Sequence, residues 1–156
     1  MKKILLITSL MITIPTLVAA KVGVEEAVLQ QAFAGYHVAE AYDEFCNKKT
    51  FDDRAKNNPN MVGNMQMIVS RLGGVVKKQN AKLNDEMAMG ALRQAAAGIK
   101  GKTKTELKQN GCESKQGTAA KQARTFFSST KPEDFAAQLS NDIKAKGGTI
   151  TPPLKK

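Results

Sequence analysis

The chain has 156 residues, of which 24 are Lys or Arg and 14 are Asp or Glu, so its formal net charge is +10. This length suits one domain and is short for two. With no Trp and only two Tyr, the chain has few rings that could stack on sugars or nucleobases. These features disfavour a carbohydrate-cleaving enzyme and a nucleic-acid-binding protein.

The first twenty residues have the pattern of an export signal. Two lysines precede an apolar stretch that ends in the small residues Val18, Ala19 and Ala20, the kind of site that a signal peptidase cleaves. We expect residues 1–20 to be removed, so that the mature chain begins at Lys21 and works in the periplasm or outside the cell. A retained anchor is the alternative, but the apolar stretch is short for a membrane span. No transmembrane segment is expected in the mature chain, whose net charge would fall from +10 to +8 with the loss of those two lysines.

The rest of the chain predicts helices, because apolar residues recur at every third or fourth position and alternating patterns are almost absent. The first predicted helix covers residues 24–47, with one apolar stripe from Val28 to Cys46. Residues 50–60 are rich in Asp, Asn and Pro and predict a loop with at most one helical turn.

Glycines divide the middle of the chain. A second helix is predicted from residue 60 or 61, with apolar residues up to Val75 or Val76 on one side, and Gly73 and Gly74 weaken it near its end. The third begins after Asn84, a favoured N-cap residue, and two further glycines weaken its second half. Thr103 and Glu106 have capping-box spacing, so we expect a restarted helix from there to residue 111.

Two more helices complete the predicted fold. One covers residues 114–128, and the other begins with Thr130 as N-cap, followed by Pro132 and a capping-box Glu133. Two glycines end it, so we expect a helical domain over residues 21–148. Residues 149–156 are predicted to be a flexible basic tail.

Cys46 and Cys112 are the only cysteines, and an oxidising compartment favours a disulfide between them. Two buried free thiols or a redox pair are the alternatives, and no Cys-x-x-Cys spacing supports the second. In an up-and-down bundle the helices that end near these cysteines run parallel, so their carboxyl ends meet. The predicted fold is therefore an all-α, single-domain bundle of four to five mostly antiparallel helices, stapled by one disulfide.

His37 is the only histidine and shares a helix side with Glu40 and Glu44, so a carboxylate-oriented imidazole is expected. A catalytic histidine also needs a nucleophile or a substrate-positioning group, and no nucleophile motif is present. We therefore predict no enzyme, no catalytic residue and no cofactor, and interpret His37 as a surface or rim residue.

Methionines suggest an alternative function. Thioethers suit Cu(I), and Met61 and Met65, with His37, could form a copper site in a periplasmic metal-handling protein. Methionine is also common core filler, and we favour that interpretation, so no metal site is preferred.

The charge pattern gives the broadest functional indication. Residues 77–124 contain eleven Lys or Arg and four acids, whereas residues 25–53 contain seven acids and two Lys, which predicts a dipolar molecule. We expect Lys100, Lys102, Lys104 and Lys108 to lie on a loosened, mobile segment and to contact the partner. The alternative is a solvated lysine face that only maintains solubility. The predicted function is an exported, non-catalytic binding protein of the bacterial envelope, an inhibitor, adaptor or secretion-system accessory, whose partner is an envelope protein or an anionic envelope component. The sequence does not specify an oligomeric state.

Overall fold

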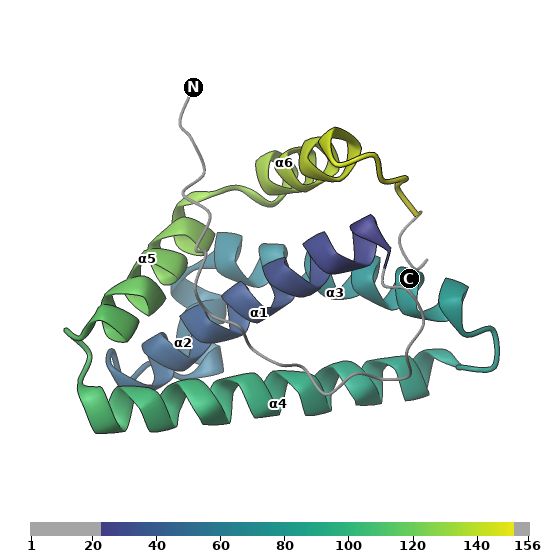
Figure 1. Cartoon of the computed structure of the whole chain (residues 1–156). Coiled ribbons are helices and arrows are strands. Elements are labelled where there is room, and N and C mark those ends of the chain that lie inside the picture. The colour runs from purple at the N-terminus through teal and green to yellow at the C-terminus, as the bar shows by residue number, and fades with distance from the viewer. Residues whose placement is uncertain (1–22, 152–156) are drawn as a thin grey trace.

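The computed structural model describes residues 23–151, which form six α-helices and contain no β-strand (Figure 1). The helices are α1 (Val24–Phe45), α2 (Phe51–Asn57), α3 (Pro59–Gln79), α4 (Asp85–Asn110), α5 (Lys115–Ser129) and α6 (Pro132–Ala145). The predicted all-α single domain is confirmed, with six helices in place of four to five. The predicted export signal and residues 152–156 of the predicted tail lie outside the described residues.

Among the described helices, α1 has the most buried residues and is the central helix of the domain. It contacts α3, α4, α5 and α6. Ala39 and Ala41 lie two positions apart, on opposite sides of the helix, and both are 0 % exposed. The apolar stripe predicted for this segment is thus only part of its buried surface, because neighbouring helices surround α1.

The disulfide joins the carboxyl ends of two parallel helices. In Figure 1, α1 and α4 run in the same direction and α3 runs opposite to both. Cys46 directly follows α1 and Cys112 lies two residues after α4, with a Cα–Cα distance of 6.0 Å. This confirms both the predicted cysteine pairing and the argument that placed the two cysteines at the same end of the bundle.

The last helix, α6, lies on the side of α1 and α3 that is opposite to α4 (Figure 1). Phe135 packs edge-on against Phe126 and Phe127 of α5, with ring centroids 5.5 and 5.3 Å apart. The segment after α6 returns to the start of α1, where the backbone N–H and the hydroxyl of Thr151 donate to the two carboxylate oxygens of Glu25 at 2.7 and 2.6 Å. The described part of the predicted tail, residues 149–151, is therefore attached to the domain at its last residue.

The predicted loop at residues 50–60 contains a short helix, α2. Thr50 caps it, because its side chain accepts a hydrogen bond from the backbone N–H of Asp53 and the Asp53 carboxylate accepts one from the Thr50 N–H. The capping box uses Asp in place of the usual Glu. The segment was predicted as a loop because it is rich in Asp and Asn, which are common in turns. The expectation of at most one helical turn was too short.

Glycine residues do not interrupt α3 or α4. Gly73 and Gly74 are buried inside α3, which continues to Gln79, and α4 is continuous from Asp85 to Asn110. The predicted restart at Thr103 is wrong, because the Thr103 side chain is buried and donates to the carbonyl of Ile99 one turn earlier. Burial of Ile99 and Leu107 against the domain outweighs the weak helix propensity of the exposed Gly98 and Gly101.

Thr130 ends α5 and does not cap α6. Its backbone N–H donates to the carbonyl of Phe126, and its own carbonyl accepts a hydrogen bond from the Asn64 side chain at 2.8 Å. Lys131 occupies the N-cap position of α6 without a side-chain hydrogen bond, and Pro132 begins the helix. The predicted capping box between Thr130 and Glu133 is therefore wrong, since the buried Asn64 fixes Thr130 in the link between the two helices.

Candidate functional site

A network of charged side chains joins α1, α2 and α4. The guanidinium of Arg54 on α2 donates from one nitrogen to Glu40 at 2.7 Å and to Glu44 at 3.2 Å. The ammonium group of Lys100 on α4 lies 3.4 Å from Glu40 and 3.3 Å from Glu44, and Lys104 forms an ion pair with Glu44. Three cations from two helices thus neutralise two carboxylates on the last turns of α1.

This network controls the ionisation of its carboxylates. Burial alone would raise the pKa of Glu40, but the hydrogen bond from His37 and the charges of Lys100 and Arg54 lower it to about 2. Burial likewise opposes ionisation of Glu44, whereas hydrogen bonds and charges from Lys104 and Lys100 lower its pKa below the ordinary value. Both groups therefore remain carboxylates in mildly acidic solution.

Acid should weaken the fold through Glu40. Its pKa is about 2 in the folded protein and 4.5 for the free side chain, so ionisation stabilises the fold above about pH 4.5, and this contribution disappears as the pH falls towards 2. The expected loss is on the order of 2 to 3 kcal/mol in the free energy of unfolding, measured by urea titrations between pH 6 and pH 2.5. Glu40→Gln should flatten this slope, whereas Glu86→Gln, at an exposed position, should leave it unchanged. An equally steep slope in Glu40→Gln would contradict the assignment.

His37 has the predicted carboxylate-oriented geometry but lies inside the domain. Its Nδ1 is 2.8 Å from a Glu40 oxygen, and its ring lies edge-on to Phe33 and Tyr36 at centroid distances of 4.5 and 5.2 Å. The other ring nitrogen, Nε2, is buried and has no hydrogen-bond partner among the described residues. The prediction of a surface or rim histidine was wrong, because the rings of α1 cover it.

The two methionines of the predicted copper alternative belong to the hydrophobic core. Met61 is 0 % exposed, and Met65 is partly buried against the same cluster. Residues 23–151 contain no group of three or more His, Cys, Asp or Glu placed to hold a metal ion. Hydrophobic packing therefore accounts for the position of Met61.

The four predicted contact lysines lie in two different environments. Lys100 and Lys104 are half-buried and paired with the carboxylates of α1. Lys102 and Lys108 are exposed and have no ion-pair partner in the part of the chain that the structure describes. All four belong to a continuous helix, so the predicted mobile segment is wrong.

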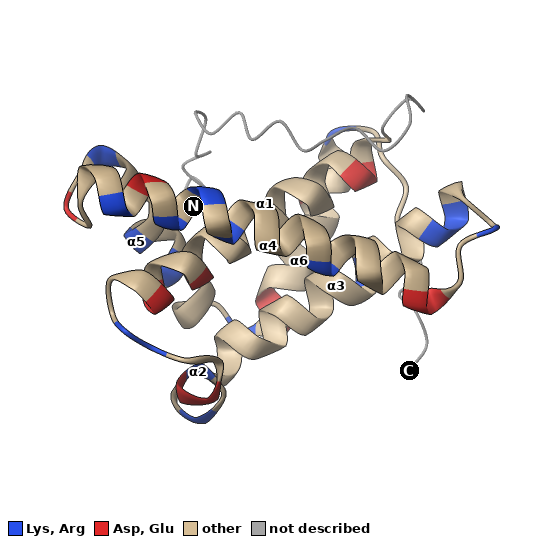
Figure 2. Ribbon diagram, turned by 90° about the horizontal axis from the view of Figure 1, so that it is seen from below, with Lys and Arg blue, Asp and Glu red and all other residues tan. Residues whose placement is uncertain are grey.

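The acidic residues of the first helix do not form an acidic surface. Glu25, Glu26, Glu40 and Asp43 are all buried, and each accepts hydrogen bonds from another part of the domain or from α1 itself. Figure 2 shows basic and acidic residues at both ends of the molecule. The predicted dipole is therefore not a division into an acidic half and a basic half, because the α1 carboxylates are directed inwards.

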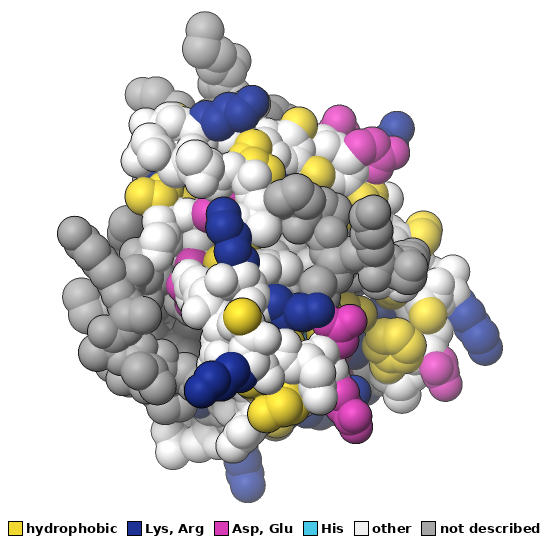
Figure 3. All heavy atoms as spheres, turned by 90° about the vertical axis from the view of Figure 1, so that its right-hand side faces the viewer, with side chains coloured by type: hydrophobic (Ala, Val, Ile, Leu, Met, Phe, Trp, Pro, Cys, Tyr) yellow, Lys and Arg dark blue, Asp and Glu magenta, His cyan; other side chains and the backbone are white. Residues whose placement is uncertain are grey.

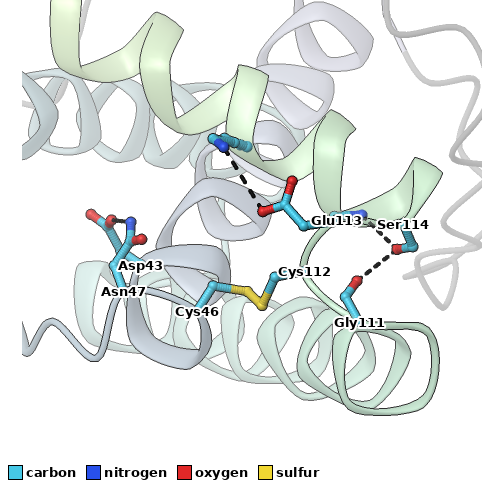
Figure 4. The surroundings of a disulfide bond; sticks show 9 residues. Asp43, Cys46, Asn47, Gly111, Cys112, Glu113 and Ser114 are labelled. Atoms are coloured by element: carbon cyan, nitrogen blue, oxygen red, sulfur yellow. Dashed lines mark hydrogen bonds and ion pairs between the residues drawn. A yellow bond between two sulfur atoms is a disulfide. The ribbon is translucent and has the colours of Figure 1, made fainter.

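A cavity of about 390 Å³ lies beside the disulfide, lined by Tyr42, Cys46, Asn47, Cys112, Glu113, Lys121, Arg124 and Thr125. Figure 4 shows Asp43 and Asn47 near the end of α1, and Glu113 and Ser114 on the segment that enters α5. The Arg124 Nε donates to the carboxylate of Asp43 at 3.0 Å, and the Asn47 amide donates to the same oxygen at 2.6 Å. The sequence did not indicate Arg124, because Asp43 lies 81 positions away from it.

At the end of the molecule with the α3–α4 connection, the described residues present a mixed surface. Figure 3 shows hydrophobic side chains interspersed with charged ones on this face. Across residues 23–151, every helix is too short or too polar to cross a membrane.

Comparison of the chain with protein-family models, curated proteins and solved structures found no match.

Proposed function

We propose that the protein is an exported, non-catalytic binding protein of the bacterial envelope, with a cationic contact surface on the solvent side of α4. The observation that carries this proposal is the difference in environment between the acidic side chains of α1 and two basic side chains of α4. The carboxylates of α1 are paired within the domain, whereas Lys102 and Lys108 of α4 are exposed without an ion-pair partner among the described residues. Such cations attract an anionic envelope component or an acidic envelope protein.

The backbone of α4 supports this interpretation. Gly98 and Gly101 are exposed, and a Cβ atom added to either would meet nothing within 4 Å. Packing within the described domain therefore does not require glycine at these positions, although each costs roughly 1 kcal/mol of helix stability relative to alanine. Their small size lets a partner approach the α4 backbone in the turn before Lys102. The surface lies on a continuous helix, in contrast to the loosened helix that the sequence suggested.

Two matched double variants test the proposal. Lys102→Gln with Lys108→Gln should slow association with an anionic partner at least severalfold and leave thermal stability nearly unchanged, because both side chains are solvated. Lys100→Gln with Lys104→Gln removes the same charge but should cost about 1 to 2 kcal/mol in stability, because Glu40 and Glu44 lose partners. The measurements are urea unfolding and association rates with the partner recovered from envelope extracts.

The salt dependence provides a further criterion. Association through exposed lysines should weaken between low and physiological salt, since the screening length is about 8 Å at 0.15 M. Equal association by the Lys102/Lys108 variant and the parent protein would contradict the α4 surface. Turnover of a cell-wall substrate by the pure protein would contradict the non-catalytic proposal.

Copper handling is the alternative function, and one observation favours it. The buried Nε2 of His37 has no described hydrogen-bond partner while Nδ1 contacts a carboxylate, an arrangement that many metal-binding histidines share. Cu(I) binding that is lost in Met61→Leu with Met65→Leu, at unchanged helical content, would support this alternative. Tight binding that survives those changes would exclude the site.

A further inference from the structure

The cavity beside the disulfide contains an arginine whose orientation is fixed from inside the protein. Asp43 is 1 % exposed, and its cationic partner is Arg124, which donates from Nε at 3.0 Å. The two terminal nitrogens of Arg124 have no hydrogen-bond partner among the described residues, and its side chain is 36 % exposed. A buried carboxylate thus anchors the inner edge of the guanidinium and leaves its outer, forked edge available at the cavity.

A second cation lies one helical turn before Arg124 on the same side of α5. Lys121 also lines the cavity, and its nearest carboxylate, that of Glu113, lies 3.9 Å away. Both members of this pair are largely exposed, so solvent screens their attraction and Lys121 can exchange Glu113 for another anion. Figure 4 shows the Glu113 side chain directed towards α5 above the disulfide.

We propose that this cavity binds the carboxylate of a small molecule or of a peptide end, with Arg124 as the bidentate donor and Lys121 as the supporting charge. A guanidinium fork matches the two oxygens of a carboxylate. Lys121 and Arg124 against Glu113 give the lining a net charge of +1, and the Asp43 carboxylate behind Arg124 reduces the positive charge further, which suits a monoanion better than a doubly charged phosphate. A volume of about 390 Å³ falls in the range of small-ligand sites.

The disulfide contributes to the shape of this site. Cys46 and Cys112 form part of the wall, and Asn47 and Glu113 follow them directly in the chain. The bond therefore fixes the end of α1 relative to the start of α5. This site goes beyond the proposed α4 surface, because none of the cavity residues belongs to α4.

The test uses the folded, disulfide-bonded protein and three small probes. N-acetylalanine carries one carboxylate, N-acetylalanine methylamide has the same body without the charge, and inorganic phosphate supplies the competing anion. We expect N-acetylalanine to produce saturable NMR shifts at the amides of Asn47, Glu113 and Thr125, and the methylamide to produce none. Arg124→Lys should weaken binding about tenfold, because it keeps the charge and removes the fork.

Two further variants separate the site from general electrostatics and from loss of folding. Lys121→Gln, at an exposed position, should weaken binding about threefold without unfolding the domain. Lys131→Gln, at the N-cap of α6, and the double change at Lys102 and Lys108 should leave the dissociation constant unchanged. Equal shifts with the methylamide, tighter binding of phosphate, or the absence of saturable shifts with N-acetylalanine would overturn the proposal.

Discussion

Replacing Cys46 and Cys112 together with alanine is expected to lower the free energy of unfolding by about 4 kcal/mol. The two cysteines are 66 positions apart, so their bond excludes many conformations of the unfolded chain. A domain of this size has a total stability of only about 5 to 15 kcal/mol, so the loss would be a large share of it. Urea unfolding of the parent and the double variant measures the difference.

Reduction of the parent protein provides the control for this experiment. It should lower the unfolding midpoint to nearly the value of the alanine variant, and reductant should have no effect on the variant itself. The helical content at low urea should persist in both, because α1 and α4 also contact each other along their lengths. A difference below about 1 kcal/mol would show that these contacts constrain the chain without the bond.

The features predicted correctly from sequence are those set by local periodicity and by covalent chemistry. The apolar residues of α1, α3, α5 and α6 recur at helical spacing, and export chemistry favoured pairing of the only two cysteines. The parallel arrangement of the helices that precede those cysteines followed from alternating helix direction. The fold class and the disulfide could therefore be predicted from the sequence alone.

The errors occurred where tertiary contacts decide between local alternatives. Thr103 is a residue type that favours N-cap positions. However, Ile99 and Leu107, one turn before and after it, are buried and keep α4 continuous. Thr130 also favours N-cap positions, but the Asn64 side chain, 66 positions away, donates a hydrogen bond to the Thr130 carbonyl and holds this residue in the link between α5 and α6. Local propensity differences of about 1 kcal/mol per residue are smaller than the burial energies that oppose them.

The candidate sites were the least predictable part. The sequence identified the glutamates of α1 and the lysines of α4, but it did not show that they pair with each other. Arg54 had no distinguishing signal within a polar segment, and Gly117 had none in α5, although a Cβ there would lie 2.1 Å from the Cys112 carbonyl oxygen. The contacts of Arg54 and those between α1 and α4 join residues that are distant in sequence, and single-sequence periodicity carries no information on such pairs.

Replacing Arg54 with Met is expected to cost about 3 to 5 kcal/mol, although Met has similar length and no polar group to bury. Arg54 is 3 % exposed and bonds both Glu40 and Glu44, so its removal leaves carboxylates with fewer partners inside the domain. It also removes a link that connects α2 to α1. The measurements are urea unfolding and hydrogen exchange of the α2 amides, which should become faster.

The matched control for this change is Lys56→Met on the same helix, where the side chain is exposed and the expected effect is within about 0.5 kcal/mol. Adding Glu40→Gln to Arg54→Met should cost less stability than Glu40→Gln costs in the parent protein, because Glu40 has already lost its Arg54 partner and keeps only Lys100 and His37. If the two single variants at Arg54 and Lys56 were equally stable, α2 would be attached by apolar packing alone. If Glu40→Gln cost as much stability in Arg54→Met as in the parent protein, the energetic role assigned to the pair would be incorrect, since the effects of two interacting residues do not add.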